Sequence, residues 1–444
     1  MTFNLTKKRV GDCIDVTDFV ANGSFASLKA NVQYLDNASP DKFAVLVRTL
    51  DFNRNWNGDY VWVDKEAYHF LKKSSLIQGD LVLCNVGSVG IVFEVPDLGL
   101  PMTLGPNSVL CRTKDKDVIR QRFIYYFFLS SVGQALLEEL SGGSTVQPKF
   151  NKTVLRNSEI DVPDLAHQDF IVRILGILDS KISTNAAISK TLESIAQTIF
   201  KSWFIDFEPV KAKMVGEKPA GMDAATAALF PDSMEESELG LIPKGWEIAP
   251  IGNVLDVGGG TTPSTTNSTY WDGEHCWTTP KDLSSQIGII TTSSTRKITD
   301  LGLAQISSGL LPINSVLMSC RAPIGYVSIN AVPTAVNQGF ITMKHSAGFH
   351  PLYVLNWINA NMQEILNRAG GATFAEITRK AFREIPFLKP ANTLMKKYAE
   401  LTEPLLKELE QLSRQTENLQ VVRDLLLPRL ISGELQIPDE MLAS

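Results

Sequence analysis

Hydrophobic and polar residues recur with helical spacing over a long stretch in the middle of the chain. Between Ala166 and Pro209 the apolar residues are separated by steps that are sums of three and four, which keeps them on one face of a helix. This stripe consists of Ile171, Leu175, Leu178, Ile182, Leu192, Ile199 and Trp203. We predict one helix of about 37 to 40 residues, roughly 55 to 60 Å long, which is longer than a single core requires.

A related stripe closes the chain and predicts a second long helix. Its members are Tyr398, Leu401, Leu405, Leu412, Leu419, Val422 and Leu426. Two such helices suggest a paired rod between two globular parts. Ser183, Asn185 and Ser189 interrupt the first stripe, so we expect an imperfect seam there.

The chain also repeats itself. Three pairs of segments align at nearly constant offsets of 235, 228 and 227 residues: 81–90 with 316–325, 141–145 with 369–373, and the apolar positions of 192–204 with those of 419–431. Self-similarity at a long period indicates a tandem duplication of one unit. We therefore predict two copies of a globular domain, each followed by a long helix.

Each copy begins with strand-like runs and continues with helices. In the first copy Phe43–Val47 and Asp80–Asn85 are rich in β-forming residues, while Ile119–Leu140 has helical length and spacing. In the second copy Val316–Ser319 and Leu352–Arg368 repeat that order. The predicted fold class is α+β, with two similar mixed α/β domains separated by an antiparallel pair of long helices in a pseudo-two-fold duplication.

Between the copies, Glu208–Gly240 collects proline, glycine and the acidic run Glu235–Glu238, which favours a linker or a poorly packed crossover. The predicted divisions are a first domain at 1–165, a long helix at 166–207, a linker at 208–240, a second domain at 241–390, a long helix at 391–436 and a tail at 437–444.

Composition narrows the class of protein. The 444 residues are 44% hydrophobic and 20% charged, as in globular proteins. The five cysteines are odd in number and form no Cys-x-x-Cys pair, which favours reduced thiols and a cytoplasmic location. The apolar run Phe123–Leu137 is short and interrupted by polar residues, so it predicts a buried helix rather than a membrane span. No apolar segment of a signal peptide follows the basic residues Lys7–Arg9.

The net charge is −6, but the acidic residues are unevenly distributed along the chain. Residues 1–160 hold 18 basic and 17 acidic side chains, and residues 241–390 hold 11 and 9. Both predicted domains are thus close to neutral, which neither favours nor excludes DNA. A two-fold arrangement of two different domains would nevertheless suit a duplex with two different half-sites.

Several motifs resemble the specificity subunit of type I restriction-modification systems, and they cover nearly the whole chain. Phe200–Pro209 is similar to the central conserved region of that family, and Leu426–Leu435 to its distal one. Ile242–Trp246 resembles the entry to a target-recognition domain, and Arg321–Gly325 with Asn337–Phe340 resembles its interior signature. The first copy departs from the pattern, with no Pro-x-Gly-Trp entry and with Gly-Pro-Asn at 105–107.

The resemblance implies a non-catalytic DNA reader in phage defence. Each domain would contact one half of a bipartite double-stranded DNA target, and the helical pair would fix the spacer. Two methyltransferase subunits would dock on the helices and use S-adenosylmethionine, while restriction subunits would add translocation and cleavage with ATP and Mg²⁺. The candidate docking residues are Phe200, Trp203, Phe204, Leu426, Leu427 and Leu430.

Base reading requires Arg or Lys for guanine, Asn or Gln for adenine, and Asp or Glu for cytosine. The candidate DNA-binding residues are Arg48, Asp51, Asn53, Arg54, Asn55, Lys281, Asp282, Ser284, Arg321, Asn337 and Gln338. Phe52 and Trp56 interleave the first group. A solvated loop explains the same residues equally well. Gly-rich segments at 142–145 and 370–373 suit either a phosphate contact or a tight helix exit.

Two other classes of function stay open. Asp164, Asp179 and Lys181 imitate the carboxylate and lysine spacing of a metal-dependent nuclease, although Asp179 and Lys181 would diverge on a helix. A coiled-coil adaptor that binds protein is the third hypothesis. The chain has no Gly-x-x-x-x-Gly-Lys-Ser/Thr, no Gly-x-Gly-x-x-Gly and no Asn/Asp-Pro-Pro-Tyr/Phe motif, and its five histidines do not have the spacing of a metal site. We expect no catalytic residue, no metal and no cofactor in this chain.

Overall fold

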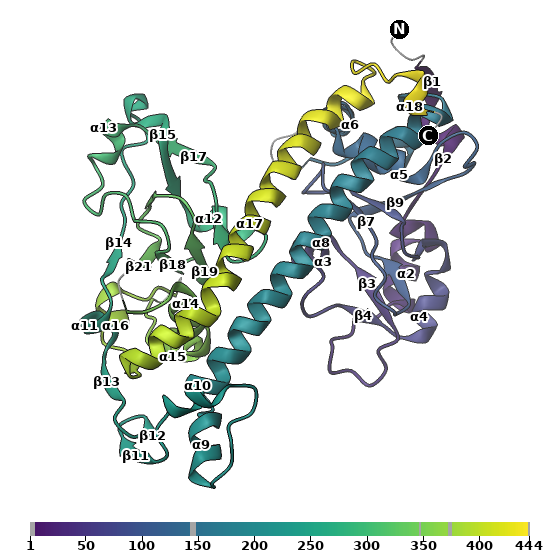
Figure 1. Ribbon diagram of the computed structural model, residues 1–444. Helices are drawn as coiled ribbons and strands as arrows, with labels where there is room; N and C mark the ends of the chain where they lie inside the picture. Colours follow the sequence, from purple (N-terminus) through teal and green to yellow (C-terminus); the bar gives the residue numbers. More distant parts are fainter. Residues whose placement is uncertain (1–4, 143–147, 346–347, 372–374, 443–444) are drawn as a thin grey trace. The chain divides into compact units, whose positions relative to one another are not determined.

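The computed structural model describes residues 5–142, 148–345, 348–371 and 375–442. The glycine-rich segments noted above fall partly outside these residues, at 143–145 and 372–373. The chain divides into two units (Figure 1): residues 1–180 with 420–444 form unit 1, and residues 181–419 form unit 2. Each is described by itself.

Two four-stranded sheets form the framework of unit 1. The first is antiparallel and has the order β2 (Ile14–Asp18), β9 (Ser108–Thr113), β6 (Leu81–Cys84), β7 (Val92–Glu94). The second has the order β4 (Trp62–Val63), β3 (Ala44–Val47), β8 (Met102–Leu104), β5 (Ser75–Leu76), with β3 and β8 parallel. A separate antiparallel pair joins β1 (Thr6–Arg9) to β10 (Glu159–Val162). Strands β3 and β6 are buried along their whole length, as their continuous apolar sequences predict.

Unit 1 also contains short helices. They are α1 (Val10–Cys13), η1 (Phe19–Asn22), α2 (Phe25–Asn31), α3 (Thr49–Asn53), α4 (Lys65–Phe70), η2 (Lys72–Ser74), α5 (Gln121–Leu129), α6 (Ser131–Leu140), α7 (Lys152–Asn157) and α18 (Asp439–Leu442).

The segment predicted to be helical over 119–140 forms two helices, because the chain turns at Ser130. That residue has extended backbone angles and its hydroxyl accepts the backbone N–H of Gly133. Only glycine fits at 133, where a Cβ would lie 2.1 Å from the carbonyl oxygen of Phe127. The short hydrophobic run is therefore two helices: α5, which is mostly buried, and α6, which buries only Gly133 and Leu137. None of the helices in the described part of the chain is long and apolar enough to cross a membrane.

Unit 2 repeats the strand plan of unit 1. Its larger sheet has the order β14 (Val257–Gly259), β21 (Phe340–Met343), β18 (Val316–Cys320), β19 (Ile324–Asn330), β16 (Ile290–Thr291). Its smaller sheet has the order β17 (Arg296–Ile298), β15 (Trp271–Thr278), β20 (Thr334–Val336), with β15 and β20 parallel as β3 and β8 are. The pair β13 (Glu247–Pro250) and β22 (Pro386–Lys389) corresponds to β1 and β10. The common topology confirms the duplication.

The helices of unit 2 follow the same order. They are α11 (Ile251–Val254), η3 (Ser268–Tyr270), α12 (Pro280–Ser285), α13 (Asp300–Leu303), α14 (Pro351–Ala360), α15 (Met362–Asn367) and α16 (Arg379–Arg383). The helix predicted over 352–368 is thus again divided, with the break at Asn361.

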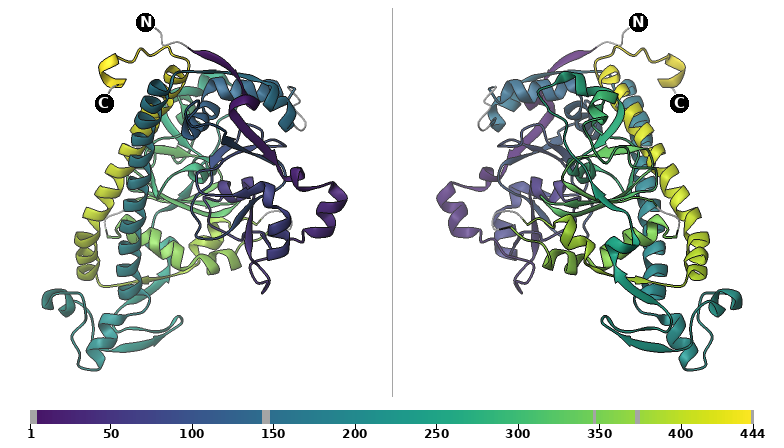
Figure 2. Two further views of the ribbon diagram at one scale, coloured as in Figure 1. Left: turned by 90° about the vertical axis from the view of Figure 1, so that its right-hand side faces the viewer. Right: turned by 90° about the vertical axis from the view of Figure 1, so that its left-hand side faces the viewer.

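The segment expected to be a loose linker is packed. It contains α9 (Glu208–Met214), α10 (Ala224–Ala228) and the hairpin β11 (Met234–Ser237) with β12 (Gly240–Pro243), which lie beyond the end of the first long helix (Figure 2, teal). Val210 and Phe230 are buried in the main core of unit 2. These apolar residues outweigh the proline, glycine and acidic signals on which the expectation rested.

Two helices of 40 residues each run through the fold: α8 (Leu165–Phe204) and α17 (Asn392–Ile431). In unit 1 Asp179 of α8 pairs with Arg423 of α17. In unit 2 the ring of Trp203, near the end of α8, contacts that of Tyr398, near the start of α17. The beginning of each helix therefore meets the end of the other, which confirms the antiparallel pair.

A polar layer interrupts the pair within unit 2. Asn185 is fully buried and donates hydrogen bonds to Gln415 Oε1 at 2.9 Å and Thr416 Oγ1 at 3.3 Å. Its own Oδ1 has no partner among the described residues. The seam is imperfect at this position, as the interrupted stripe predicts.

Candidate nucleic-acid interface

In unit 2 the loops that follow several strands meet at one place. Asn337, just after β20, donates its backbone N–H to Thr278 at the end of β15 at 3.2 Å. Gly339, just before β21, accepts the backbone N–H of Cys320 at the end of β18 at 2.8 Å. These contacts bring together four candidates from three segments that are far apart in sequence. We name Lys281, Arg321, Asn337 and Gln338 the loop edge of unit 2.

Glycines allow the backbones at this edge to approach closely. A Cβ on Gly260 would lie 1.8 Å from the carbonyl oxygen of Val336, and one on Gly339 would lie 3.0 Å from Pro280 Cγ. The close approach lets Thr262 donate its hydroxyl to Gln338 Oε1 at 2.5 Å. Gln338 is exposed, so its amide is held in one orientation while facing solvent.

The other edge residues are also positioned by neighbours. Asn337 Oδ1 accepts the backbone N–H of Gly339 at 2.9 Å, which stabilises the turn. Arg321 donates to Glu376 at 3.3 Å, and both side chains stay about two-fifths exposed. Lys281 and Ser284 are exposed on α12, where the Ser284 hydroxyl donates to the carbonyl oxygen of Lys281. Cations and amides in this arrangement can reach a ligand outside the protein.

Unit 1 has the same edge with different side chains. Gly105 donates its N–H to Val47 at 2.8 Å and Asn107 accepts that of Asn85 at 3.0 Å, which reproduces the two contacts of unit 2. Asn107 is exposed, so it belongs to this edge together with Arg48 at the end of β3. We name Arg48, Asn107 and the turn 53–55 the loop edge of unit 1.

The turn at 53–55 presents its polar residues because its aromatic neighbours anchor it. Phe52 stacks on Phe93 at 4.9 Å between ring centroids, and Trp56 meets the same ring edge-on at 5.7 Å. Asn53, Arg54 and Asn55 are left exposed. The interleaving of aromatic and polar residues in the sequence therefore corresponds to an inner and an outer face.

Two of the candidate carboxylates serve the backbone instead. Asp51 is only 3% exposed and accepts the N–H and the guanidinium of Arg48, the residue that caps α3. This burial corrects the expectation that Asp51 reads a base.

Asp282 has the matching place in α12, where it accepts the backbone N–H and the hydroxyl of Thr279 and the N–H of Thr295. Burial alone would raise the pKa of Asp282, but hydrogen bonds from Thr279 and Thr295 lower it below its usual value. These contacts begin a helix at the same place in both units, and capping accounts for Asp282 as it does for Asp51.

Some exposed cations were missed by the sequence reasoning. Lys149 forms an isolated β-bridge with Val86, and Glu376 forms the equivalent bridge with Arg321. Lys149 and Glu376 are 227 residues apart, so the sequence repeat could have located Lys149 beside the loop edge of unit 1. Arg296 places its guanidinium carbon 3.5 Å above the ring of Trp271. No sequence pattern indicated this cation–π contact, because Arg296 comes from the next strand of the sheet.

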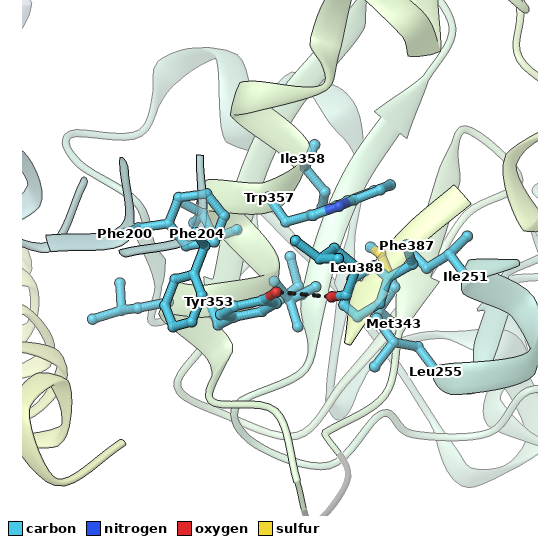
Figure 3. Close-up of a cluster of buried hydrophobic side chains, with 14 of the residues drawn as sticks. Phe200, Phe204, Ile251, Leu255, Met343, Tyr353, Trp357, Ile358, Phe387 and Leu388 are labelled. Atoms are coloured by element: carbon cyan, nitrogen blue, oxygen red, sulfur yellow. Dashed lines mark hydrogen bonds between the residues drawn. The ribbon is translucent and has the colours of Figure 1, made fainter. Parts of the chain in front are cut away.

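The predicted docking residues are inside the protein. Phe200, Trp203 and Phe204 are 2%, 5% and 2% exposed and belong to the core of unit 2. Figure 3 shows Phe200 and Phe204 beside Tyr353. A partner cannot contact these side chains in this conformation, since they stabilise the chain itself.

At the other helix end, Leu426, Leu427 and Leu430 pack into the core of unit 1, and Leu427 and Leu430 are buried. The large apolar residues that remain exposed on the long helices are Ile177, Ile188 and Ile195 of α8 and Leu401, Val421, Val422 and Leu425 of α17.

The residues of the nuclease hypothesis have other partners. Asp179 accepts the hydroxyl of Tyr126 at 2.7 Å and the guanidinium of Arg423 at 3.1 Å, while Asp164 contacts His167 at 2.9 Å. Lys181 is exposed. Among the described residues, no group of three or more His, Cys, Asp and Glu side chains is arranged to hold a metal ion. No observation favours a nuclease.

Comparison with known proteins defines the class. The family model described as type I restriction modification DNA specificity domain matches twice, at residues 31–194 and 243–418. The chain therefore belongs to this family and is a DNA sequence-recognition subunit of the type I restriction-modification class.

Individual relatives agree with this assignment. The specificity subunit of the type I restriction enzyme HindI of Haemophilus influenzae is 26% identical over 366 residues, covering 72% of this chain and 78% of its own. That of MjaIX of Methanocaldococcus jannaschii is 24% identical over 408 residues, covering 86% and 88%. The crystal structure of an S subunit from M. genitalium shares the fold, with a TM-score of 0.52 at 14% identity over 97% of this chain and 96% of that one.

Proposed function

We propose that this chain reads an asymmetric two-part DNA sequence, with unit 1 contacting one half-site and unit 2 the other. The observation that carries the proposal is the repeated loop edge, built by equivalent backbone contacts in each unit. The exposed side chains differ between the two edges, so they would read different bases. A duplicated scaffold with different surfaces suits a target whose halves differ.

Within this proposal, Gln338 is the strongest candidate for a base contact. Amide side chains pair with adenine through both their oxygen and their nitrogen. Thr262 already fixes the orientation of the Gln338 amide, so less conformational entropy would be lost on binding. Arg321, Lys281 and Ser284 would contribute guanine or phosphate contacts nearby. In unit 1 the corresponding role falls to Arg48, Asn53, Arg54 and Asn55.

Methylome sequencing of a host that expresses the chain with its modification subunits tests this division. Gln338→Ala is expected to relax one half-site and leave the other unchanged. Gln305→Ala, which removes an exposed glutamine elsewhere in unit 2, should change neither half-site. An altered half-site assigned to unit 1, or an unchanged target with Gln338→Ala, would contradict the proposed role of Gln338.

We also propose that the exposed apolar residues of α8 and α17 dock two methyltransferase subunits. Ser substitutions at Val421 and Leu425, which are 53% and 64% exposed, should weaken association by about tenfold. Leu301→Ser is the matched control, because Leu301 is 61% exposed but lies outside the long helices. Unchanged co-purification with the modification subunit would exclude this surface.

The long helices would then set the number of unread bases between the half-sites. An insertion of about one heptad into both helices, within 187–194 and 409–416, should lengthen the spacer and leave both half-sites intact. Altered half-sites would show that the insertions disturb the reading domains themselves, which would contradict the assignment of these segments to a spacer.

The chemistry in this proposal belongs to partners in the cytoplasm. Methyltransferase subunits would supply S-adenosylmethionine-dependent methylation, and restriction subunits would supply ATP- and Mg²⁺-dependent translocation and cleavage. This chain would bind duplex DNA without catalysing a reaction. A reconstituted complex that methylates the same sequence in the absence of this chain would refute the proposal.

A further inference from the structure

The two units differ in charge at one matched position beside their loop edges. Asp18 is the last residue of β2 and pairs with Val109, the second residue of β9. Gly259 is the last residue of β14 and pairs with Ile341, the second residue of β21. Since β9 and β21 have the same place in the sheet order, Asp18 and Gly259 occupy the same position in the two copies.

A cation lies against this position in both units. Lys152, the first residue of α7, places its Nζ 2.7 Å from Asp18 Oδ1, and both side chains are largely buried at 26% and 16% exposure. Arg379, the first residue of α16, lies along the backbone of Gly259. A Cβ on Gly259 would be 3.1 Å from Arg379 Cδ and 3.3 Å from Arg379 Nε. The glycine thus leaves room for the arginine and offers it no carboxylate.

The charge of Arg379 is not neutralised by a carboxylate of the described residues. Arg379 is exposed, and no Asp or Glu oxygen of the described residues lies within 4.0 Å of its guanidinium. Arg321, a cation of the loop edge, already shares its charge with Glu376. Within the described part of the chain, unit 2 therefore presents a guanidinium without a carboxylate partner where unit 1 presents a lysine neutralised by Asp18.

Arg379 is also held next to the residues proposed to read bases. Ile377, two residues before it, donates its N–H to Cys320 at 3.1 Å, and the Cys320 thiol lies 3.7 Å from the carbonyl oxygen of Gln338. An exposed guanidinium with its planar fork free matches the oxygens of a phosphate group. A duplex presents its phosphates on the outside, where an exposed guanidinium can reach them.

We propose that Arg379 binds a backbone phosphate of the DNA half-site next to unit 2, and that unit 1 lacks the equivalent contact because Asp18 neutralises Lys152. This inference rests on the proposed DNA-reading function. It predicts that the two units contribute unequally to the salt dependence of binding, with unit 2 contributing one more phosphate contact from this position.

The test measures binding of the chain, assembled with its modification subunits, to a duplex that contains its target, over a series of salt concentrations. Affinity falls as salt rises, and Arg379→Gln should make the slope of log affinity against log salt less steep by about 0.9. The same change should weaken binding by about five- to tenfold at 0.1 M salt. The loss should be equal on specific and non-specific duplexes, and the methylated sequence should not change. Arg379→Lys keeps the charge and should keep the slope.

Unit 1 supplies the matched controls. Lys152→Gln should leave the slope unchanged, because that lysine is already paired. Asp18→Asn removes the carboxylate that pairs with Lys152 and should make the slope steeper by about 0.9. An unchanged slope with Arg379→Gln, or a loss confined to the specific duplex, would overturn the inference. If the complex with the unsubstituted chain prefers no DNA sequence, the proposed function itself is refuted. The two failures can therefore be told apart.

Discussion

Asp179 offers a sharp test of whether the carboxylates of α8 serve the fold or a reaction. One oxygen accepts the Tyr126 hydroxyl at 2.7 Å and the other accepts the Arg423 guanidinium at 3.1 Å. The Asp179 side chain is 21% exposed and that of Arg423 is 30% exposed. Asp179 thereby ties α5, α8 and α17 together inside unit 1, and its replacement by alanine removes both contacts.

The cost follows from the three groups involved. Hydrogen bonds to a charged group contribute about 1.5 to 3 kcal/mol, and the Tyr126 hydroxyl, at the edge of a buried ring, would lose its partner. Arg423 is partly exposed and also pairs with Asp424 at 2.9 Å, so its loss is smaller, at about 0.5 to 1 kcal/mol. We therefore expect Asp179→Ala to lower the free energy of unfolding of unit 1 by about 3 kcal/mol.

Denaturant unfolding of the full chain measures this change, with the transition of unit 1 followed separately. A double-mutant cycle with Tyr126→Phe should give a coupling of about 1 to 2 kcal/mol, larger than that of a cycle with Arg423→Ala. Lys181→Ala is the control, because that side chain is exposed and should change stability by less than about 0.5 kcal/mol.

The outcome also separates the two classes of function. A nuclease would lose Mg²⁺-dependent cleavage with Asp179→Ala while keeping its stability. If Asp179 serves the fold, Asp179→Ala should lower the stability of unit 1, and the unsubstituted chain should not cleave DNA. A loss below about 0.5 kcal/mol for Asp179→Ala would refute the stabilising role of its contacts with Tyr126 and Arg423.

Three further predictions concern unit 2. Gly260→Ala should destabilise it by about 1 to 3 kcal/mol in denaturant unfolding, because the new Cβ would lie 1.8 Å from a carbonyl oxygen of β20, whereas Gly370→Ala meets open space and should be near neutral. Trp203→Ala should cost about 3 to 5 kcal/mol by the same measurement, since the ring is buried in the core. Burial lowers the pKa of His350 below 6.5 in the folded chain. As the pH falls, His350 is therefore protonated in the unfolded chain before it is protonated in the folded chain. Stability should therefore decrease below about pH 6.5, and His350→Gln should flatten that decrease down to about pH 5. Glu403 does not contribute in this range, because the burial that raises the pKa of its carboxyl is outweighed by hydrogen bonds from His350 and Lys407, which lower it.

Long periodic segments were the most predictable part of the fold. The apolar stripe begins and ends close to the observed bounds of α8, because one face of the helix is buried near both of its ends, by Ile171 and Leu175 in unit 1 and by Trp203 in unit 2. The breaks at Ser130 and Asn361 were not predicted. Both lie in segments that carry several polar residues, of which only one marks the turn, so the pattern alone did not indicate where the chain turns.

The candidate site was predictable in part. The sequence repeat located the segments that form the two loop edges, but residue type did not separate readers from helix caps. Asp51 and Asp282 each lie three residues after the residue that precedes a helix, which is the spacing of a capping box, and this signal could have identified their role. The cation–π position of Arg296 depends on strand pairing and could not be read from the chain.

The duplication explains why the two edges can differ without loss of the fold. The backbone contacts that build each edge use main-chain atoms, so they place no demand on the exposed side chains. Asp18 and Gly259 fit the same strand end, and Lys149 and Glu376 fit the same isolated bridge, although their charges differ. Exchanging Lys149 and Glu376 would change the charge beside the loop edges and leave the main-chain contacts in place. Exchanging these two residues between the units should therefore alter binding more than folding.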